Sequence, residues 1–282
     1  MRNLQILPRL SDSISFLYLE KMVIRRKQNT IEALDEEGRI PIPVSSLSVL
    51  MLGPGTSISH SAINILAKNG CMVVWVGEDM TRFYAQGMGE TYKAYKVVRQ
   101  AELVSDPRKR KKVVVAMYRM RFNDDLDENL SLPQIRGHEG VRMRKVYAAW
   151  SKETGVKWEG RQYNFQSWGG SPINRAISTA NAILNAICNT IIVSAGYSPA
   201  LGFIHQGRQL SFVYDIADLY KTEITIPIAF QVVGEAADQV EKRVRLAVRE
   251  KINESKLISR ILPDINMLLD INEQEQEHEE HI

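Results

Sequence analysis

The sequence predicts an α+β protein in which a small β domain precedes a larger helical domain. Short β-rich runs dominate the first ninety or so residues, and apolar residues recur at helical spacing from residue 92 onward. Gly87-Met88-Gly89 marks the change between the two patterns. We therefore assign residues 1–88 to the β domain, residues 89–271 to the helical domain, and residues 272–282 to an acidic tail predicted to be disordered.

The β domain is predicted from short apolar runs separated by turn residues. The segment Asp35-Glu36-Glu37-Gly38 is a turn between two extended runs and predicts a hairpin over residues 29–42. Further strands are predicted at residues 13–24, 48–52, 71–76 and 81–86. A short helix is predicted at residues 61–68, because residues 56–59 supply N-cap side chains and Gly70 follows its end.

Helical regions are predicted throughout the chain after the glycine-containing boundary. The apolar spacing predicts helices over residues 92–120 with a break at Pro107, over residues 139–152, and over residues 174–195. After Pro227 the chain consists of amphipathic stretches whose apolar positions are Val244, Ala247, Val248, Ile252, Ile258, Leu262 and Leu268. The run at residues 173–195 contains four asparagines and an arginine, which favours a core helix over a membrane span.

The composition is that of an ordinary globular protein, with 44% hydrophobic and 24% charged residues. Cys71 and Cys188 form neither a disulfide framework nor a CxxC pattern, which fits a reducing cytoplasm, and no signal peptide is predicted. The net charge is +3, although five glutamates are concentrated in the tail. The remaining, more basic body fits either a polyanionic partner or a merely soluble surface.

The segment of residues 196–221 contains candidate chemical groups. His205 lies in a predicted loop, and Ser211 can cap a following helix that carries Asp215 and Asp218. Because these aspartates are three residues apart, a helix places them on one face. A bound cation or exposure to solvent would each relieve their repulsion, so both interpretations remain open.

A second candidate segment spans residues 134–150. Glu139 is predicted at the start of a helix, surrounded by Arg136, Arg142, Arg144 and Lys145. It is either a surface acid in a salt-bridged turn or a metal ligand with arginines near a bound phosphate.

Together these segments supply Glu139, His205, Asp218 and, as a further acid, Asp215. Oxygen ligands with one imidazole suit Mg²⁺ or Mn²⁺ and would support phosphoryl transfer. The basic run at residues 107–112 either contacts a phosphate backbone or is a solvated helix face. Near the candidate site in sequence lie groups that can hold phosphates or stack on bases, namely Arg161, Tyr163, Arg208 and Tyr214.

Several segments, in order, resemble the integrase of the CRISPR adaptation module, most closely its type I-E branch. They are LGPGTSISHSAI, VVWVGEDMTRFYAQG, GHEGVRMRKVYA, WEGRQYNFQSW and AGYSPALGFIHQGRQLSFVYDIADLYK. The resemblance extends from the first strand to about Leu262. It implies an N-terminal β-sandwich, an all-α catalytic domain, a homodimer, and a heterohexamer with a small ferredoxin-like second adaptation protein.

The resemblance also implies a reaction in the prokaryotic cytoplasm. A metal-dependent DNA integrase and endonuclease captures double-stranded or forked DNA. It then inserts the fragment as a new spacer by 3′-OH attack on the phosphodiester at the leader–repeat border. The alternatives are a stand-alone nuclease on branched DNA, a non-catalytic DNA-binding scaffold and, more remotely, an enzyme acting on small diphosphates.

The family positions that match this sequence assign site residues as expectations. Glu139, His205 and Asp218 match the metal ligands, with Asp215 as an adjacent essential acid. Arg136, Tyr163, Arg208 and Tyr214 match residues that contact a single-stranded overhang, and Arg82 and Arg245 match backbone contacts. The chain differs from the family at Lys21, Ser57 and Asn185, so the resemblance assigns no duplex-end stacking residue or fragment-length ruler.

Overall fold

A computed structural model of the chain describes residues 5–6, 16–47, 49–77, 83–87, 94–122, 130–161 and 171–270. Its strands are β1 (Gln5–Ile6), β2 (Phe16–Leu19), β3 (Val23–Lys27), β4 (Thr30–Asp35), β5 (Gly38–Ile42), β6 (Val49–Leu52), β7 (Ser57–Ile58), β8 (Met72–Val76) and β9 (Phe83–Gly87). Its α-helices are α1 (His60–Lys68), α2 (Tyr95–Ser105), α3 (Pro107–Phe122), α4 (Leu132–Thr154), α5 (Pro172–Ser194), α6 (Ser211–Tyr220), α7 (Ile226–Glu235), α8 (Val240–Glu254) and α9 (Leu257–Leu268). The predicted α+β class is confirmed.

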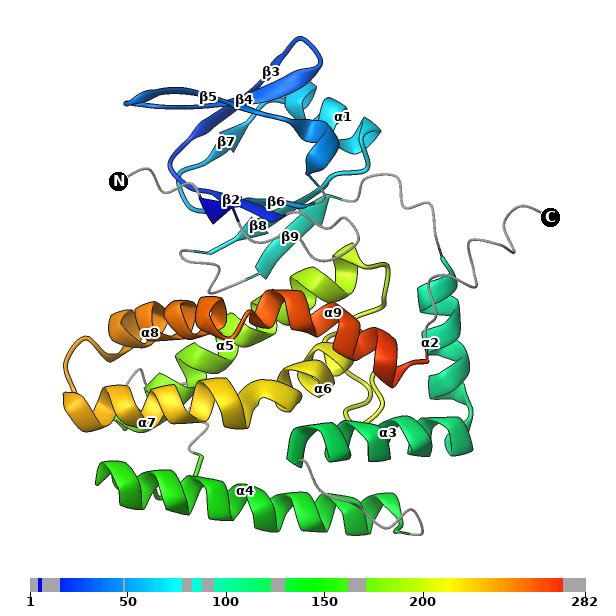
Figure 1. Cartoon of the computed structure of the whole chain (residues 1–282), viewed down its shortest axis with the longest axis vertical. Coiled ribbons are helices and arrows are strands. Elements are labelled where there is room, and N and C mark those ends of the chain that lie inside the picture. Colours follow the sequence, from blue (N-terminus) through cyan, green and yellow to red (C-terminus); the bar gives the residue numbers. More distant parts are fainter. Residues whose placement is uncertain are drawn as a thin grey trace.

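The described strands form two sheets, one of order β1-β2-β6-β8-β9 and the other of order β5-β4-β3-β7. The predicted hairpin is β4 and β5, and its turn is fixed because the Asp35 carboxylate accepts from the backbone amides of Glu37 and Gly38. One apolar core contains residues of both sheets and of α1, so the domain is a sandwich (Figure 1). Ser59 caps α1 by accepting from the amide of Ala62.

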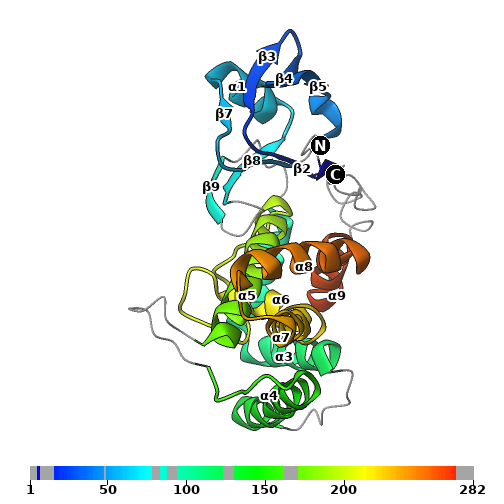
Figure 2. The same cartoon turned by 90° about the vertical axis from the view of Figure 1, so that its left-hand side faces the viewer.

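The parallel strands β2, β6 and β8 are buried on both faces, which explains their unbroken apolar sequences. Successive side chains of a strand point to opposite faces. In β6, Leu50 and Leu52 join the sandwich core, whereas Val49 and Met51 join the core of the helical domain. The same sheet therefore packs on both partners, and Figures 1 and 2 show it between the other sheet and the helices.

Two sequence-based boundaries differ in the structure. Residues 13–24 were predicted as one extended run, but a turn with Lys21 at φ 55° separates β2 from β3, which lie in different sheets. The second difference concerns α4, which begins at Leu132 rather than Glu139, after a Ser131 and Gln134 capping box with a proline in its first turn. Pro133, Gly137 and Gly140 weaken the helical pattern there, so the sequence predicted only its second half.

The helical domain is built around α5, which contacts α6, α7, α8 and α9 (Figure 2). By length and composition α5 is the one described helix that could span a membrane, yet 72% of its most apolar window is buried inside the protein. This burial is typical of a core helix. The apolar positions predicted after Pro227 also pack into this core.

A π-helical turn, Lys221–Thr225, joins α6 to α7. Pro227 follows it and has no backbone N–H, which disrupts regular α-helical hydrogen bonding at this point. The Thr225 hydroxyl donates to Asn181 Oδ1 on α5 at 2.8 Å and fixes the turn to the central helix. The division that we placed at residues 88 and 89, and the tail at residues 272–282, lie outside the described residues.

Candidate functional site

Asp215 on α6 organises the loop that carries His205. Its carboxylate is fully buried, and it accepts from the backbone amides of Phe203, Ile204 and His205 at 2.5, 3.0 and 2.9 Å. Gly202 permits this tight loop, because a Cβ there would lie 2.3 Å from the His205 carbonyl oxygen and 2.7 Å from the Ser211 Cβ. One carboxylate therefore binds three successive amides of the loop, at residues 203–205.

The same carboxylate orients the imidazole of His205. His205 Nδ1 lies 2.7 Å from Asp215 Oδ1, and because an ionised carboxylate only accepts, Nδ1 is the donor. In the neutral ring this leaves the Nε2 lone pair available for a ligand. The hydrogen bond to Asp215 raises the pKa of His205 above its ordinary value, although partial burial opposes this effect.

Glu139 on α4 and Asp218 on α6 are linked through Arg121 of α3. Glu139 accepts from the Tyr118 hydroxyl at 2.7 Å and pairs with Arg121 Nη1. The same Nη1 lies 3.6 Å from Asp218 Oδ2. Asp218 also forms an ion pair with Lys221, so the two carboxylates are held by protein cations. Burial, and the nearby charge of Glu139, raise the pKa of Tyr118 far above its usual range and keep it a donor.

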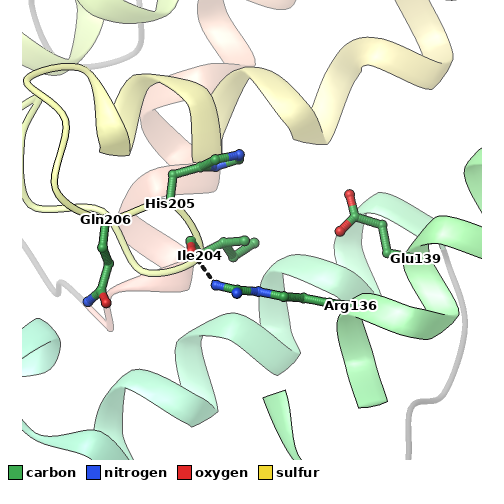
Figure 3. A pocket seen from close by; sticks show the side chains of 5 residues that line it. All are labelled: Arg136, Glu139, Ile204, His205 and Gln206. Atoms are coloured by element: carbon green, nitrogen blue, oxygen red, sulfur yellow. Dashed lines mark hydrogen bonds between the residues drawn. The ribbon is translucent and has the colours of Figure 1, made fainter. Parts of the chain in front are cut away.

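A pocket of about 330 Å³ opens beside these groups, lined by Arg136, Glu139, Ile204, His205 and Gln206. Figure 3 shows the ring of His205 on one side of the pocket and the carboxylate of Glu139 on the other. Arg136 lies beside them and donates from Nη2 to the Ile204 carbonyl at 2.8 Å. The pocket thus combines an acid, an imidazole and a guanidinium from two distant segments.

The residue types, two carboxylates and an imidazole, fit a hard divalent cation. Within the described residues, however, no three His, Cys, Asp or Glu side chains converge closely enough to bind one ion. Instead, Arg121 and Lys221 pair with the carboxylates of Glu139 and Asp218. Binding a cation through Glu139, His205 and Asp218 would require these basic side chains to release them, so this ligand set stays a prediction.

Asp215 and Asp218 share α6, as their spacing predicted, but their surroundings differ. Asp215 is fully buried and bonded to the loop, whereas Asp218 is partly exposed and pairs with Arg121 and Lys221. Ser211 does not cap α6 from outside. It is the first helical residue, and its hydroxyl donates to the Arg208 carbonyl.

Of the residues predicted to contact DNA, the structure places some near His205 and others away from the pocket. Tyr214 lies against His205 with ring centroids 5.9 Å apart, and Arg208 is exposed in the same loop. Arg245 is on α8, and Arg161 lies near Ser178 of α5, so neither lines the pocket. Arg82 and Tyr163 lie outside the described residues.

Sequence reasoning missed Tyr118, Arg121 and Lys221. Lys221 was detectable, because it follows Asp218 by three residues and such pairs meet on a helix. Tyr118 and Arg121 lie 21 and 18 residues before Glu139, beyond the reach of any local pattern.

The α+β architecture and the pocket define a class of two-domain proteins with an acid and an imidazole converging on one site. Comparison with protein families identifies this chain more closely. The model of the family described as "CRISPR associated protein Cas1" matches residues 16–124 and 111–245. The chain belongs to the Cas1 family.

Curated relatives match almost the whole chain. A protein of Thermus thermophilus named CRISPR-associated endonuclease Cas1 2 is 51% identical over 265 residues, which cover 94% of this chain and 82% of the relative. The CRISPR-associated endonuclease Cas1 of Escherichia coli K12 is 38% identical over 262 residues, which cover 92% of this chain and 86% of that protein.

Solved structures share the fold. The crystal structure of a TtCas1–DNA complex is 50% identical, with a TM-score of 0.85 over 93% of this chain and 99% of that one. A casposase bound to an integration product has the same fold, with a TM-score of 0.61 at 15% identity, over 92% of this chain and 96% of that one.

Proposed function

We propose that this protein is a metal-dependent DNA strand-transferase that inserts captured DNA into a CRISPR array. The 3′-OH of the fragment attacks the phosphodiester at the leader–repeat border, and a second attack occurs at the other end of the repeat. The observation that carries the proposal is the pocket in which Glu139, His205 and Arg136 meet beside Asp218. The related TtCas1 was crystallised with DNA, and the curated relatives are named endonucleases, which supports DNA as the substrate.

The proposed cofactor is Mg²⁺ or Mn²⁺ bound by Glu139, His205 and Asp218. When bound, the ion would polarise a non-bridging phosphate oxygen and stabilise the leaving 3′-oxygen. The chain's own residues prepare the site. Asp215 orients the imidazole, Tyr118 hydrogen-bonds to Glu139, and the Arg136 guanidinium offers positive charge to a phosphate in the pocket.

Arg208 and Tyr214 are proposed to contact the single-stranded end of the captured fragment. Arg208 lies in the loop that carries His205, and Tyr214 lies on α6 with its ring against the imidazole of His205. We further propose backbone contacts from Arg82 and Arg245, additional contacts from Arg161 and Tyr163, and assembly as a homodimer within a heterohexamer with the small second adaptation protein. The type I-E branch and the cytoplasmic location are likewise proposals.

The test combines the chain with the second adaptation protein, Mg²⁺ or Mn²⁺, a labelled forked fragment and a plasmid bearing a leader and repeat. The variants are His205→Ala and Asp218→Asn. The matched control is Asp264→Asn, which changes a carboxylate bonded to Tyr220 away from the pocket. We expect label at the leader–repeat border with the wild type and the control. It should be lost in both site variants and with a chelator.

Two results would replace the proposal. If the wild type nicks branched DNA equally with and without the partner, and joins nothing, the protein is a stand-alone nuclease. If it binds DNA but neither cuts nor joins it with either metal, the site is a feature of a DNA-binding scaffold.

A further inference from the structure

The loop that carries His205 is anchored by side chains from two helices far away in sequence. We infer that Gln100 of α2 and Arg110 of α3 are positioning residues that set the place of His205 in the pocket. This inference rests on the proposed function for its catalytic consequence, but its structural basis is a set of contacts to the loop backbone between Ser198 and His205.

Gln100 is a fully buried polar side chain whose amide group is used entirely by this loop. Its Nε2 donates to the carbonyls of Ser198 and Leu201, both at 3.0 Å, and its Oε1 accepts from the Ser198 amide at 2.8 Å. Both N–H donors and the carbonyl acceptor are thereby satisfied. A buried amide matched in this way fixes one backbone arrangement, because any other leaves polar groups unpaired.

Arg110 provides the second anchor, closer to the imidazole. Its Nε donates to the Phe203 carbonyl at 2.7 Å, while the Asp215 carboxylate accepts from the amide of Ile204. These two groups belong to the same peptide unit, which is therefore held from both sides, one residue before His205. Arg110 lies in the basic run at residues 107–112, so one member of that run is directed at the protein rather than at solvent.

The helix α2 is itself bonded to the residues that follow α9. Arg99, next to Gln100, donates from Nε to the Leu269 carbonyl at 3.4 Å, and its Nη2 lies 3.6 Å from the Asp270 carboxylate. Figure 1 shows α2 near the end of α3 that it precedes and near the end of α9. Neither Gln100 nor Arg110 lines the pocket, so both act through the loop and not on the substrate.

The test replaces Gln100 with methionine, which has similar length and volume but cannot make these hydrogen bonds. The two readouts are hydrogen exchange of the backbone amides of residues 198–205 in the metal-free protein, and kcat of DNA joining with saturating DNA. We expect exchange in this segment to become faster. We expect kcat to fall by about 10- to 100-fold, as for other residues that support a ligand, with DNA affinity unchanged.

Tyr197→Phe is the control for stability. It removes the hydrogen bond from the Tyr197 hydroxyl to Asn266 beside the loop and leaves the anchoring side chains Gln100 and Arg110 unchanged. With the two variants compared at equal fractions folded, Gln100→Met must accelerate amide exchange in residues 198–205 more than Tyr197→Phe does. It must also lower kcat more than Tyr197→Phe does. Equal exchange and equal kcat in the two variants would overturn the inference.

Arg110→Met is the second variant, in case Gln100→Met does not fold. Arg108→Met removes the same charge from the exposed side of α3. It is therefore the baseline for what loss of this charge alone does to DNA affinity, amide exchange and kcat. Faster exchange at residues 203–205 and a lower kcat than this baseline would support the inference, whereas effects equal to the baseline would contradict it. If the wild type joins no DNA, the proposed function fails, while the exchange readout still decides whether the loop is anchored.

Discussion

A single oxygen of Asp215 holds His205 at two points, accepting from its backbone amide at 2.9 Å and lying 2.7 Å from its imidazole Nδ1. Backbone and side chain are thus set by the same carboxylate. Asp215→Asn should therefore lower the pKa of His205 toward the ordinary value of about 6.5. An NMR titration of the imidazole in metal-free protein measures this, and an unchanged pKa would show that Asp215 is not the cause of the shift.

The same pair predicts a pH dependence of stability. The pKa of His205 is higher in the folded protein than in the unfolded chain. The stabilisation that protonated His205 gives the fold is therefore fully present below the pKa of the unfolded chain, and it is lost as the pH rises through the pKa of the folded protein. The difference in unfolding free energy between wild type and Asp215→Asn should therefore be largest below about pH 6.5 and shrink as the pH rises above that value. Urea unfolding at several pH values measures it; a difference that grows with pH would have the wrong sign.

Arg121→Met should make the stability of the protein more dependent on metal. Arg121 is 5% exposed and pairs with Glu139 while approaching Asp218, so its loss leaves two carboxylates without this cation. We expect a cost of about 3 kcal/mol without metal and a larger increase in Tm on adding Mn²⁺ than in the wild type. The control Arg260→Met breaks a more exposed pair with Glu223, expected to contribute no more than about 1 kcal/mol. Equal responses to Mn²⁺ in both variants would argue against a cation at these carboxylates.

Gly202→Ala should disturb the site through packing. The added Cβ would meet the His205 carbonyl oxygen and the Ser211 Cβ at distances that force the loop to move. We expect a loss of about 1–3 kcal/mol and loss of DNA joining. Gly207→Ala is the contrasting variant, because a Cβ at Gly207 would meet no atom within 4 Å. The φ of Gly207 is +78°, so this substitution should still cost about 1 kcal/mol of stability, but it should leave the pocket intact. Full activity in folded Gly202→Ala would contradict the geometry described for the loop.

Local patterns predicted most elements and part of the site. The Asp35 turn, the Ser59 cap and the three-residue spacing of Asp215 and Asp218 are short-range features, and each lies where the sequence placed it. The start of α4 was missed, because a capping box outweighs the helix-breaking residues that follow it. The partners of the site residues were also missed. Gln100 meets Ser198 across 98 residues, and only the packed fold brings them together.

The most direct test of the central claim compares two captured fragments in the joining reaction, one ending in a 3′-OH and one in a 3′-deoxy sugar. Strand transfer at the pocket of Glu139 and His205, with Asp218 beside it, predicts joined product only with the 3′-OH fragment, and none with Asp218→Asn. Cleavage of the plasmid to the same extent with both fragments, without joining, would show water as the nucleophile and contradict the proposed integrase.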